Sequence, residues 1–130
     1  MQLELGGKAA IVTGGSRGIG AAIAAQLVRE GASICLVASD PARLERAAAT
    51  LRQAGEGKVV HCAVDLRDPA AAAQVVEAAL RELGRLDILV NCAGATKRGD
   101  FFALSDADWM DGFALKFHGA VRLTRQAWPH

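Results

Sequence analysis

Short apolar segments alternate four times with segments of helical periodicity, and this alternation limits the possible folds more than any other feature of the chain. The apolar segments cover residues 9–13, 33–38, 58–64 and 86–91. Nearly continuous apolar runs of this kind are typical of strands that are covered on both faces. Strands that alternate with helices form parallel sheets. We therefore expect one α/β domain in which helices cover both faces of a four-stranded parallel sheet.

Capping residues indicate where the helices begin. Asp-Pro pairs at residues 40–41 and 68–69 each place a capping carboxylate before a proline at the first helical position. Ser105, three residues before Asp108, forms a variant of the capping box for the last helix, and residues 95–104 form a predicted loop before it. The predicted buried stripes are Ile19, Ile23 and Leu27 in the first helix, Leu44, Ala47, Ala48 and Leu51 in the second, and Val75, Val76, Ala79, Leu80 and Leu83 in the third.

The distribution of charge excludes some classes of partner. The 130 residues include 15 basic and 14 acidic side chains, which gives a net charge of +1. They are interspersed, without the basic stripe that nucleic acids or anionic membranes attract. The N-terminus lacks the basic start and apolar run of a signal peptide, and the longest apolar runs, such as residues 34–38, fall far short of the roughly 20 residues that span a bilayer. We expect a soluble, cytoplasmic protein.

The cysteines do not indicate a metal site or a disulfide. Cysteines 35, 62 and 92 are odd in number, and each lies in an apolar segment. The three histidines form no cluster with them. We interpret the thiols as small buried hydrophobic groups and predict no bound metal.

A glycine-rich turn joins the first strand to the first helix. Residues 13–20 read Thr-Gly-Gly-Ser-Arg-Gly-Ile-Gly. Glycines would be useful in any tight turn of this kind. They also let a phosphate approach the backbone, and the N–H groups of the following helix attract its negative charge. Because the turn lies between a strand and a helix, we predict that it binds a dinucleotide.

The spacing Thr-Gly-x3-Gly-x-Gly resembles the fingerprint of the short-chain dehydrogenase/reductase family. Three other segments resemble that family as well: the lead-in at residues 5–8, Asp65-Leu66 after the third strand, and residues 86–94. The last of these matches the family's Asn-Asn-Ala-Gly stretch, except that Cys92 occupies the second asparagine position. The resemblance covers essentially the whole chain.

The resemblance implies a Rossmann-type doubly wound sheet of strand order 3-2-1-4, and an oxidoreductase that transfers hydride between a nicotinamide and an alcohol or ketone. Asp65 would contact the adenine, Asn91 would steady the central sheet, and Ala93-Gly94 would line the cofactor. The cofactor-binding residues that we expect are Thr13, Gly14, Ser16, Arg17, Gly18, Ile19, Gly20, Ser39, Asp65, Leu66, Asn91, Ala93 and Gly94.

The cofactor is predicted to be NADP, with NAD as the alternative. An acidic residue about 20 positions after the glycines would bind a ribose hydroxyl and favour NAD. Asp40 is the only candidate, and its role as a helix cap already accounts for it. Ala38 closes the second strand in the position that corresponds to the family's acidic residue. Arg17 therefore stays available for a 2′-phosphate, and Ser39 adds a hydroxyl.

The family's catalytic groups are not found in this sequence. In the family, a tyrosine acts as the general acid and base, and a serine, a lysine and an asparagine assist it. The chain contains no tyrosine, and we expect the segment that carries the serine and Tyr-x3-Lys to follow residue 130. We interpret residues 1–130 as the dinucleotide-binding part of a truncated enzyme that is inactive alone. The alternatives are a non-catalytic dinucleotide-binding or interaction module, and a half-enzyme completed by another chain.

Lys116 occupies the position of the family's asparagine. Helical periodicity places it on the apolar side of the last helix, beside Trp109, Gly112, Ala120 and Leu123 and opposite Asp111, His118, Arg122 and Arg125. Its aliphatic stem could lie on apolar surface with the ammonium in water. It could also replace the asparagine as a relay or positioning group. No catalytic residue is assigned with certainty.

Two apolar surfaces predict a homo-oligomer. Residues 88–90 would form an open sheet edge, which can pair with another chain. The last helix also carries an apolar side without an evident neighbour, formed by Phe113, Phe117, Val121 and Trp128. Family members commonly dimerise through this helix. The sequence does not indicate the substrate.

Overall fold

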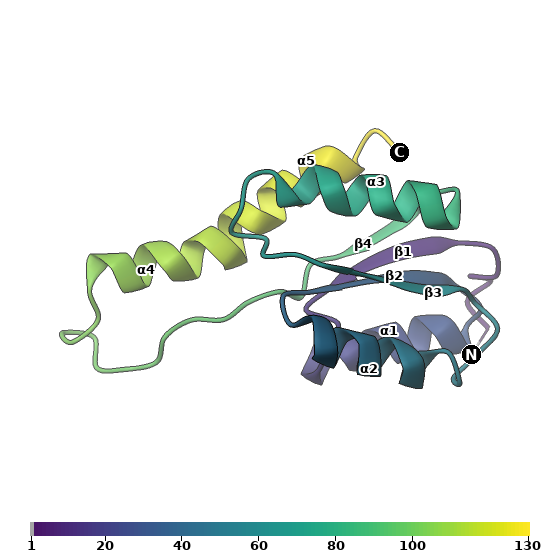
Figure 1. Ribbon diagram of the computed structural model, residues 1–130, viewed down its shortest axis with the longest axis horizontal. Coiled ribbons are helices and arrows are strands. Elements are labelled where there is room, and N and C mark those ends of the chain that lie inside the picture. The colour runs from purple at the N-terminus through teal and green to yellow at the C-terminus, as the bar shows by residue number, and fades with distance from the viewer. Residues whose placement is uncertain (1) are drawn as a thin grey trace.

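The computed structural model describes residues 2–130 and contains one parallel four-stranded sheet in the order β3-β2-β1-β4 (Figure 1). The strands are β1 (Ala9–Thr13), β2 (Ser33–Ala38), β3 (Val59–Ala63) and β4 (Ile88–Val90). The predicted α/β class and strand order are confirmed. The third and fourth strands are shorter at both ends than predicted, although Lys58, Val64 and Asp87 beside them still form backbone hydrogen bonds to β2 or β1.

Helices cover both faces of the sheet, as predicted. They are α1 (Gly18–Arg29), α2 (Pro41–Leu51), α3 (Ala71–Leu83), α4 (Asp106–Phe113) and α5 (Ala120–Ala127), with a π-helical segment η1 (Ala114–Gly119) between the last two. α1 and α2 lie on one face, and α3 and α5 lie on the other (Figure 1). α4 extends beyond the sheet, and the segment that connects β4 to α4 runs below α4 in this view (Figure 1).

Each face of the sheet has its own apolar core. Every residue of β1 is buried, and its side chains alternate between the two cores. Ala10 and Val12 pack with α1 and α2, whereas Ile11 packs with α3 and α5. Burial on both faces explains why the strand sequences are continuously apolar rather than alternating.

The buried face of α1 differs from the predicted stripe. Ile19 is 76% exposed, and Ile23 and Leu27 are only half-buried. The buried face is instead formed by the residues one position later in the sequence, namely Gly20, Ala24 and Val28. The prediction was wrong because this helix is apolar almost all round, so periodicity alone did not fix which side approaches the sheet. Small residues let the helix backbone come closer than isoleucine and leucine would allow.

The start of α3 also differs from the prediction. The first helical residue is Ala71, and its N-cap Ala70 makes no side-chain capping bond. Asp68 Oδ1 does accept a hydrogen bond from the backbone N–H of Ala70, at 2.9 Å, but this bond closes a turn before the helix. By contrast, the predicted caps of α2 and α4 are confirmed. Asp40 accepts from the N–H of Arg43, and Ser105 and Asp108 form a reciprocal capping box.

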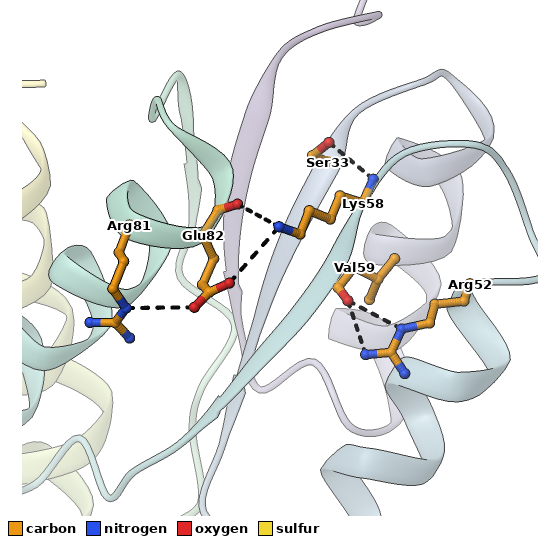
Figure 2. Close-up of polar contacts among 6 residues, drawn as sticks. All are labelled: Ser33, Arg52, Lys58, Val59, Arg81 and Glu82. Carbon is orange, nitrogen blue, oxygen red and sulfur yellow. Dashed lines mark hydrogen bonds and ion pairs between the residues drawn. The ribbon is translucent and has the colours of Figure 1, made fainter.

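The outer edge of the sheet at β3 is partly shielded by a side chain. The carbonyl of Lys58 accepts from the N–H of Ile34 in β2, so the next carbonyl, that of Val59, faces away from the sheet. Arg52 donates to this Val59 carbonyl through Nε and Nη2, at 3.2 and 3.0 Å (Figure 2). Nearby, Lys58 Nζ donates to the carbonyl of Glu82 near the end of α3 (Figure 2). These contacts fix the β3 edge against α2 and α3.

No helix within residues 2–130 has the length and apolar character needed to cross a membrane. The three cysteines are free thiols. Cys35 is fully buried, and burial raises its pKa to about 12, so the thiol stays protonated and behaves as a small hydrophobic group, as predicted. Cys62 and Cys92 are half-buried.

Candidate functional site

The turn between β1 and α1 has two positions, Gly14 and Gly20, where backbone atoms lie too close for any side chain. Gly14 has φ of +64°, and a Cβ there would lie 2.7 Å from the carbonyl oxygen of Cys92. A Cβ on Gly20 would overlap the carbonyl oxygen of Gly14. Both obstacles are backbone atoms, which cannot move aside as a flexible side chain could. The glycines therefore bring three segments together: the turn, the start of α1 and the segment after β4.

The N-terminus of α1 is free to accept an anion. Its N-cap residue, Arg17, makes no side-chain capping bond, and the first turn contains no acidic residue. The first N–H groups of a helix have no partner within the helix, and they carry positive partial charge. The first residues of α1, Gly18, Ile19 and Gly20, line a groove, so a phosphate could bind there.

A groove of about 390 Å³ follows the carboxyl ends of the four strands, where doubly wound sheets bind their ligands. Eleven of the thirteen predicted cofactor-binding residues line it, namely Gly14, Ser16, Arg17, Gly18, Ile19, Gly20, Ser39, Asp65, Leu66, Ala93 and Gly94. The structure thus brings together residues that lie as much as 80 positions apart in the sequence, such as Gly14 and Gly94.

The other two predicted residues, Thr13 and Asn91, do not line the groove. Thr13 is buried, and its Oγ1 accepts from the N–H groups of Cys92 and Ala93, both at 3.0 Å. This side chain fixes the segment after β4 against the glycine turn. Asn91 Nδ2 instead donates to Thr124 Oγ1, at 3.2 Å, and so links the end of β4 to α5. Both are positioning residues in this structure.

Asp40 lies at the rim of the groove, but its carboxylate is already used as a cap. Its Oδ1 accepts from the N–H of Arg43, at 3.2 Å, and this hydrogen bond holds the pKa of the carboxyl below its ordinary value. The interpretation of Asp40 as the N-cap of α2 is confirmed.

Two cations of the groove have no carboxylate partner. Arg67 forms ion pairs with Asp65, at 3.3 Å, and with Asp111 of α4, at 3.0 Å. Within residues 2–130, neither Arg17 nor Arg43 lies within 4.0 Å of a carboxylate oxygen. Together with Ser39 they line the part of the groove beside β2 and the start of α1.

Arg43 was not predicted from the sequence, although the cap formed by Asp40 and Pro41 was. The motif shows that Arg43 lies in the first turn of α2, but not that this turn faces the groove. Cys92 and Leu115 also line the groove and were not predicted to do so. Leu115 could not have been found from sequence, because its position depends on the π-helical segment.

Lys116 lies in that π-helical segment, away from the main groove. Its stem contacts Gly94: a Cβ added there would lie 3.5 Å from Lys116 Cδ. Lys116 shares a second cavity with Trp109 and Gly112, two of its predicted neighbours. Leu123, a third predicted neighbour, is fully buried in the core beside α3 instead. The extra residue of a π-helical turn shifts the helical register, so a constant 100° per residue does not hold across it.

Within residues 2–130, no group of three His, Cys, Asp or Glu side chains has the geometry to hold a metal ion. The groove offers backbone N–H groups, guanidinium groups, the hydroxyls of Ser16 and Ser39 and an apolar wall. This combination suits an elongated ligand that carries phosphates.

Comparison with known proteins gives the family. The family model described as short chain dehydrogenase matches residues 8–130. The chain is 37% identical over 119 residues to the 2,3-dihydro-2,3-dihydroxybenzoate dehydrogenase of Bacillus subtilis (strain 168), which covers 92% of this chain and 45% of that protein.

Solved structures agree in fold over nearly the whole chain. The L-sorbose reductase of Gluconobacter frateurii, solved with NADPH and L-sorbose, superposes with a TM-score of 0.93 at 39% identity, over 99% of this chain and 49% of that one. A short chain dehydrogenase of Burkholderia cenocepacia J2315, solved with NADP, gives a TM-score of 0.91 at 32% identity, over 98% of this chain and 52% of that one. The chain thus spans about half the length of these relatives. It belongs to the short-chain dehydrogenase family.

Proposed function

We propose that residues 1–130 are the NADP-binding domain of an oxidoreductase that transfers hydride between the nicotinamide and an alcohol or ketone carbon. Three lines support this function: the family, the groove at the carboxyl ends of the strands, and the NADPH and NADP in the two similar structures. When bound, NADP supplies or accepts the hydride. The residues of this chain would bind and orient it.

The glycine turn and the N-terminus of α1 would hold the pyrophosphate through backbone N–H groups. Asp65 would contact the adenine, as the family resemblance implies. Ala93 and Gly94 would line the other end of the cofactor. Thr13 would support this end indirectly, because its hydroxyl fixes the N–H groups of Cys92 and Ala93.

One observation carries the preference for NADP: Arg17 and Arg43 line the groove without carboxylate partners, whereas Asp40 is used as a cap. A free carboxylate at this place would bind the ribose hydroxyl of NAD and repel a 2′-phosphate. Two free guanidinium groups and the hydroxyl of Ser39 would attract that phosphate instead.

Calorimetric titration with NADPH and NADH tests this proposal. Each of Arg17→Ala and Arg43→Ala should weaken NADPH binding by about tenfold or more, since a hydrogen bond to a charged group contributes about 1.5–3 kcal/mol. NADH binding should change little, because NADH lacks the phosphate. Arg46→Ala is the matched control, because Arg46 is an exposed arginine of α2 that does not line the groove. Equal affinity of the unmodified chain for NADPH and NADH would contradict the preference, and saturable binding of neither would contradict the domain assignment.

We further propose that these 130 residues bind the cofactor without turnover. They include no tyrosine, and the family resemblance assigns the general acid and base to a tyrosine. Reduction of any ketone by the purified chain would contradict this. The domain would act in the cytoplasm as a homo-oligomer that associates through the exposed apolar side of the helix formed by α4, η1 and α5.

A further inference from the structure

A second cavity, of about 340 Å³, lies between α4–η1 and the segment that leads to them. Its walls include the side chains of Leu104, Trp109, Phe113 and Phe117. The three aromatic side chains are about half exposed, at 45, 54 and 55%, so their faces are open to a ligand. The volume lies in the range of small-molecule sites. This cavity therefore suits a compact apolar body, and an aromatic ring in particular.

The second cavity continues from the end of the main groove. Ala93, Gly94 and Ala95 line the groove, and the next residues, Thr96 and Lys97, line the cavity. In the π-helical segment, Leu115 likewise lines the groove while its neighbour Lys116 lines the cavity. A ligand in the cavity would thus lie beside the end of the groove formed by the segment after β4.

The charges around the cavity leave one cation unpaired. Asp108 is the only carboxylate that lines it. Asp108 Oδ2 already accepts from Ser105 N–H, at 3.0 Å, and pairs with Lys97 Nζ, at 3.4 Å. Within residues 2–130, Lys116 Nζ has no carboxylate oxygen within 4.0 Å and no hydrogen-bond acceptor. A Cβ on Gly94 would lie 3.5 Å from Lys116 Cδ, so the stem of this exposed lysine lies beside a residue that lines the groove.

We propose that this cavity binds the substrate, and that the substrate is a small aromatic or similarly apolar carboxylic acid whose carboxylate pairs with Lys116. The apolar body would lie against Trp109, Phe113 and Phe117. The identification of this ligand as the substrate rests on the proposed function, because a substrate must place its reacting carbon beside the nicotinamide. The binding itself depends only on the cavity and on Lys116.

Two ligands with the same aromatic ring but different charge test this inference: 2-naphthoate and 2-naphthalenemethanol. Each is titrated into the ¹⁵N-labelled chain, and the amide shifts of residues 94–97 and 108–117 are followed. We expect both to shift these amides and 2-naphthoate to bind up to about fivefold more tightly, as a partly exposed ion pair of about 1 kcal/mol allows. Lys116→Met keeps the stem and removes the charge, so it should abolish this difference. Arg98→Met, which removes a cation from the same loop but not from the cavity wall, should preserve it.

Equal affinity for the two ligands in the unmodified chain would overturn the inference, as would a 2-naphthoate preference that persists in Lys116→Met. The same samples are titrated with NADPH, so that the two proposals fail separately. If NADPH does not bind but the Lys116-dependent preference is found, the proposed function fails and the anion site stands. If NADPH binds and the preference is absent, only the present inference fails.

Discussion

Gly20 and Gly14 make the closest backbone contact of the candidate site. A Cβ on Gly20 would overlap the carbonyl oxygen of Gly14 and would lie 2.7 Å from its carbonyl carbon. Gly20→Ala should therefore push α1 away from the turn and disturb the packing of Ala24 and Val28 on the sheet. We expect a loss of about 1–3 kcal/mol in the free energy of unfolding, as overpacking typically costs, together with loss of NADPH binding.

Gly6→Ala is the control for this prediction. Its added methyl would meet no atom within 4 Å, and Gly6 does not have a positive φ. We expect its free energy of unfolding to change by less than about 0.5 kcal/mol. Urea unfolding followed by circular dichroism measures both variants. A Gly20→Ala protein as stable as Gly6→Ala, with unchanged affinity for NADPH, would show that the close approach is not required.

At the residue scale, the sequence predicted the chemistry of the site better than the direction of its side chains. The glycine turn and Asp40 as a cap follow from local rules that need no tertiary information, whereas the residues after β3 and β4 follow from the family resemblance. Whether Ile19 or Gly20 faces the sheet depends on how close α1 can approach β1, and this is a property of the packed pair. Arg43 was missed for the same reason, since its reach into the groove depends on how α2 lies across β2.

At the scale of elements, β3 is an edge strand whose outward carbonyl at Val59 is bonded by Arg52. Open edges pair readily with other chains, and a charged side chain on the edge opposes this. Arg52→Ala should lower the free energy of unfolding by about 1 kcal/mol and increase aggregation on heating, measured by light scattering. Arg46→Ala removes the same charge from an exposed position of α2, the helix that Arg52 follows, and should aggregate like the unmodified chain. Equal scattering by the two variants would contradict a protective role for Arg52.

The last helix shows what periodicity can and cannot predict about an element. Its start was predicted correctly, because Ser105 and Asp108 form a local hydrogen-bonded box. In its interior, three of the four predicted neighbours of Lys116, namely Trp109, Gly112 and Ala120, line a cavity with it, whereas Leu123 is buried in the core. The sequence contains no signal for a π-helical turn that the rules of regular helices would detect. The burial of Leu123 and the existence of the second cavity required the structure.

At the scale of the whole molecule, the chain has one large apolar surface that its own core does not cover. It runs along η1 and α5 and includes Phe117, Val121 and Trp128, which are 55, 40 and 84% exposed. These residues line a shallow hollow of about 660 Å³. Contiguous exposed apolar surface of this kind typically marks an interface, and a two-fold dimer would bury the same surface on both partners.

A charge placed in the middle of this surface should therefore disrupt the proposed dimer. Val121→Lys would bring two unpaired ammonium groups into a two-fold interface, which we expect to weaken self-association at least about tenfold in sedimentation velocity. Lys116 and Phe117 line both this hollow and the second cavity, but Val121 does not line the second cavity, so the binding of 2-naphthoate and of NADPH should persist in the monomer. Leu3→Lys places the same charge on another exposed apolar residue, 46% exposed, and should leave association unchanged. A chain that sediments as a monomer at every concentration, or a Leu3→Lys variant as impaired as Val121→Lys, would show that this surface does not mediate a dimer.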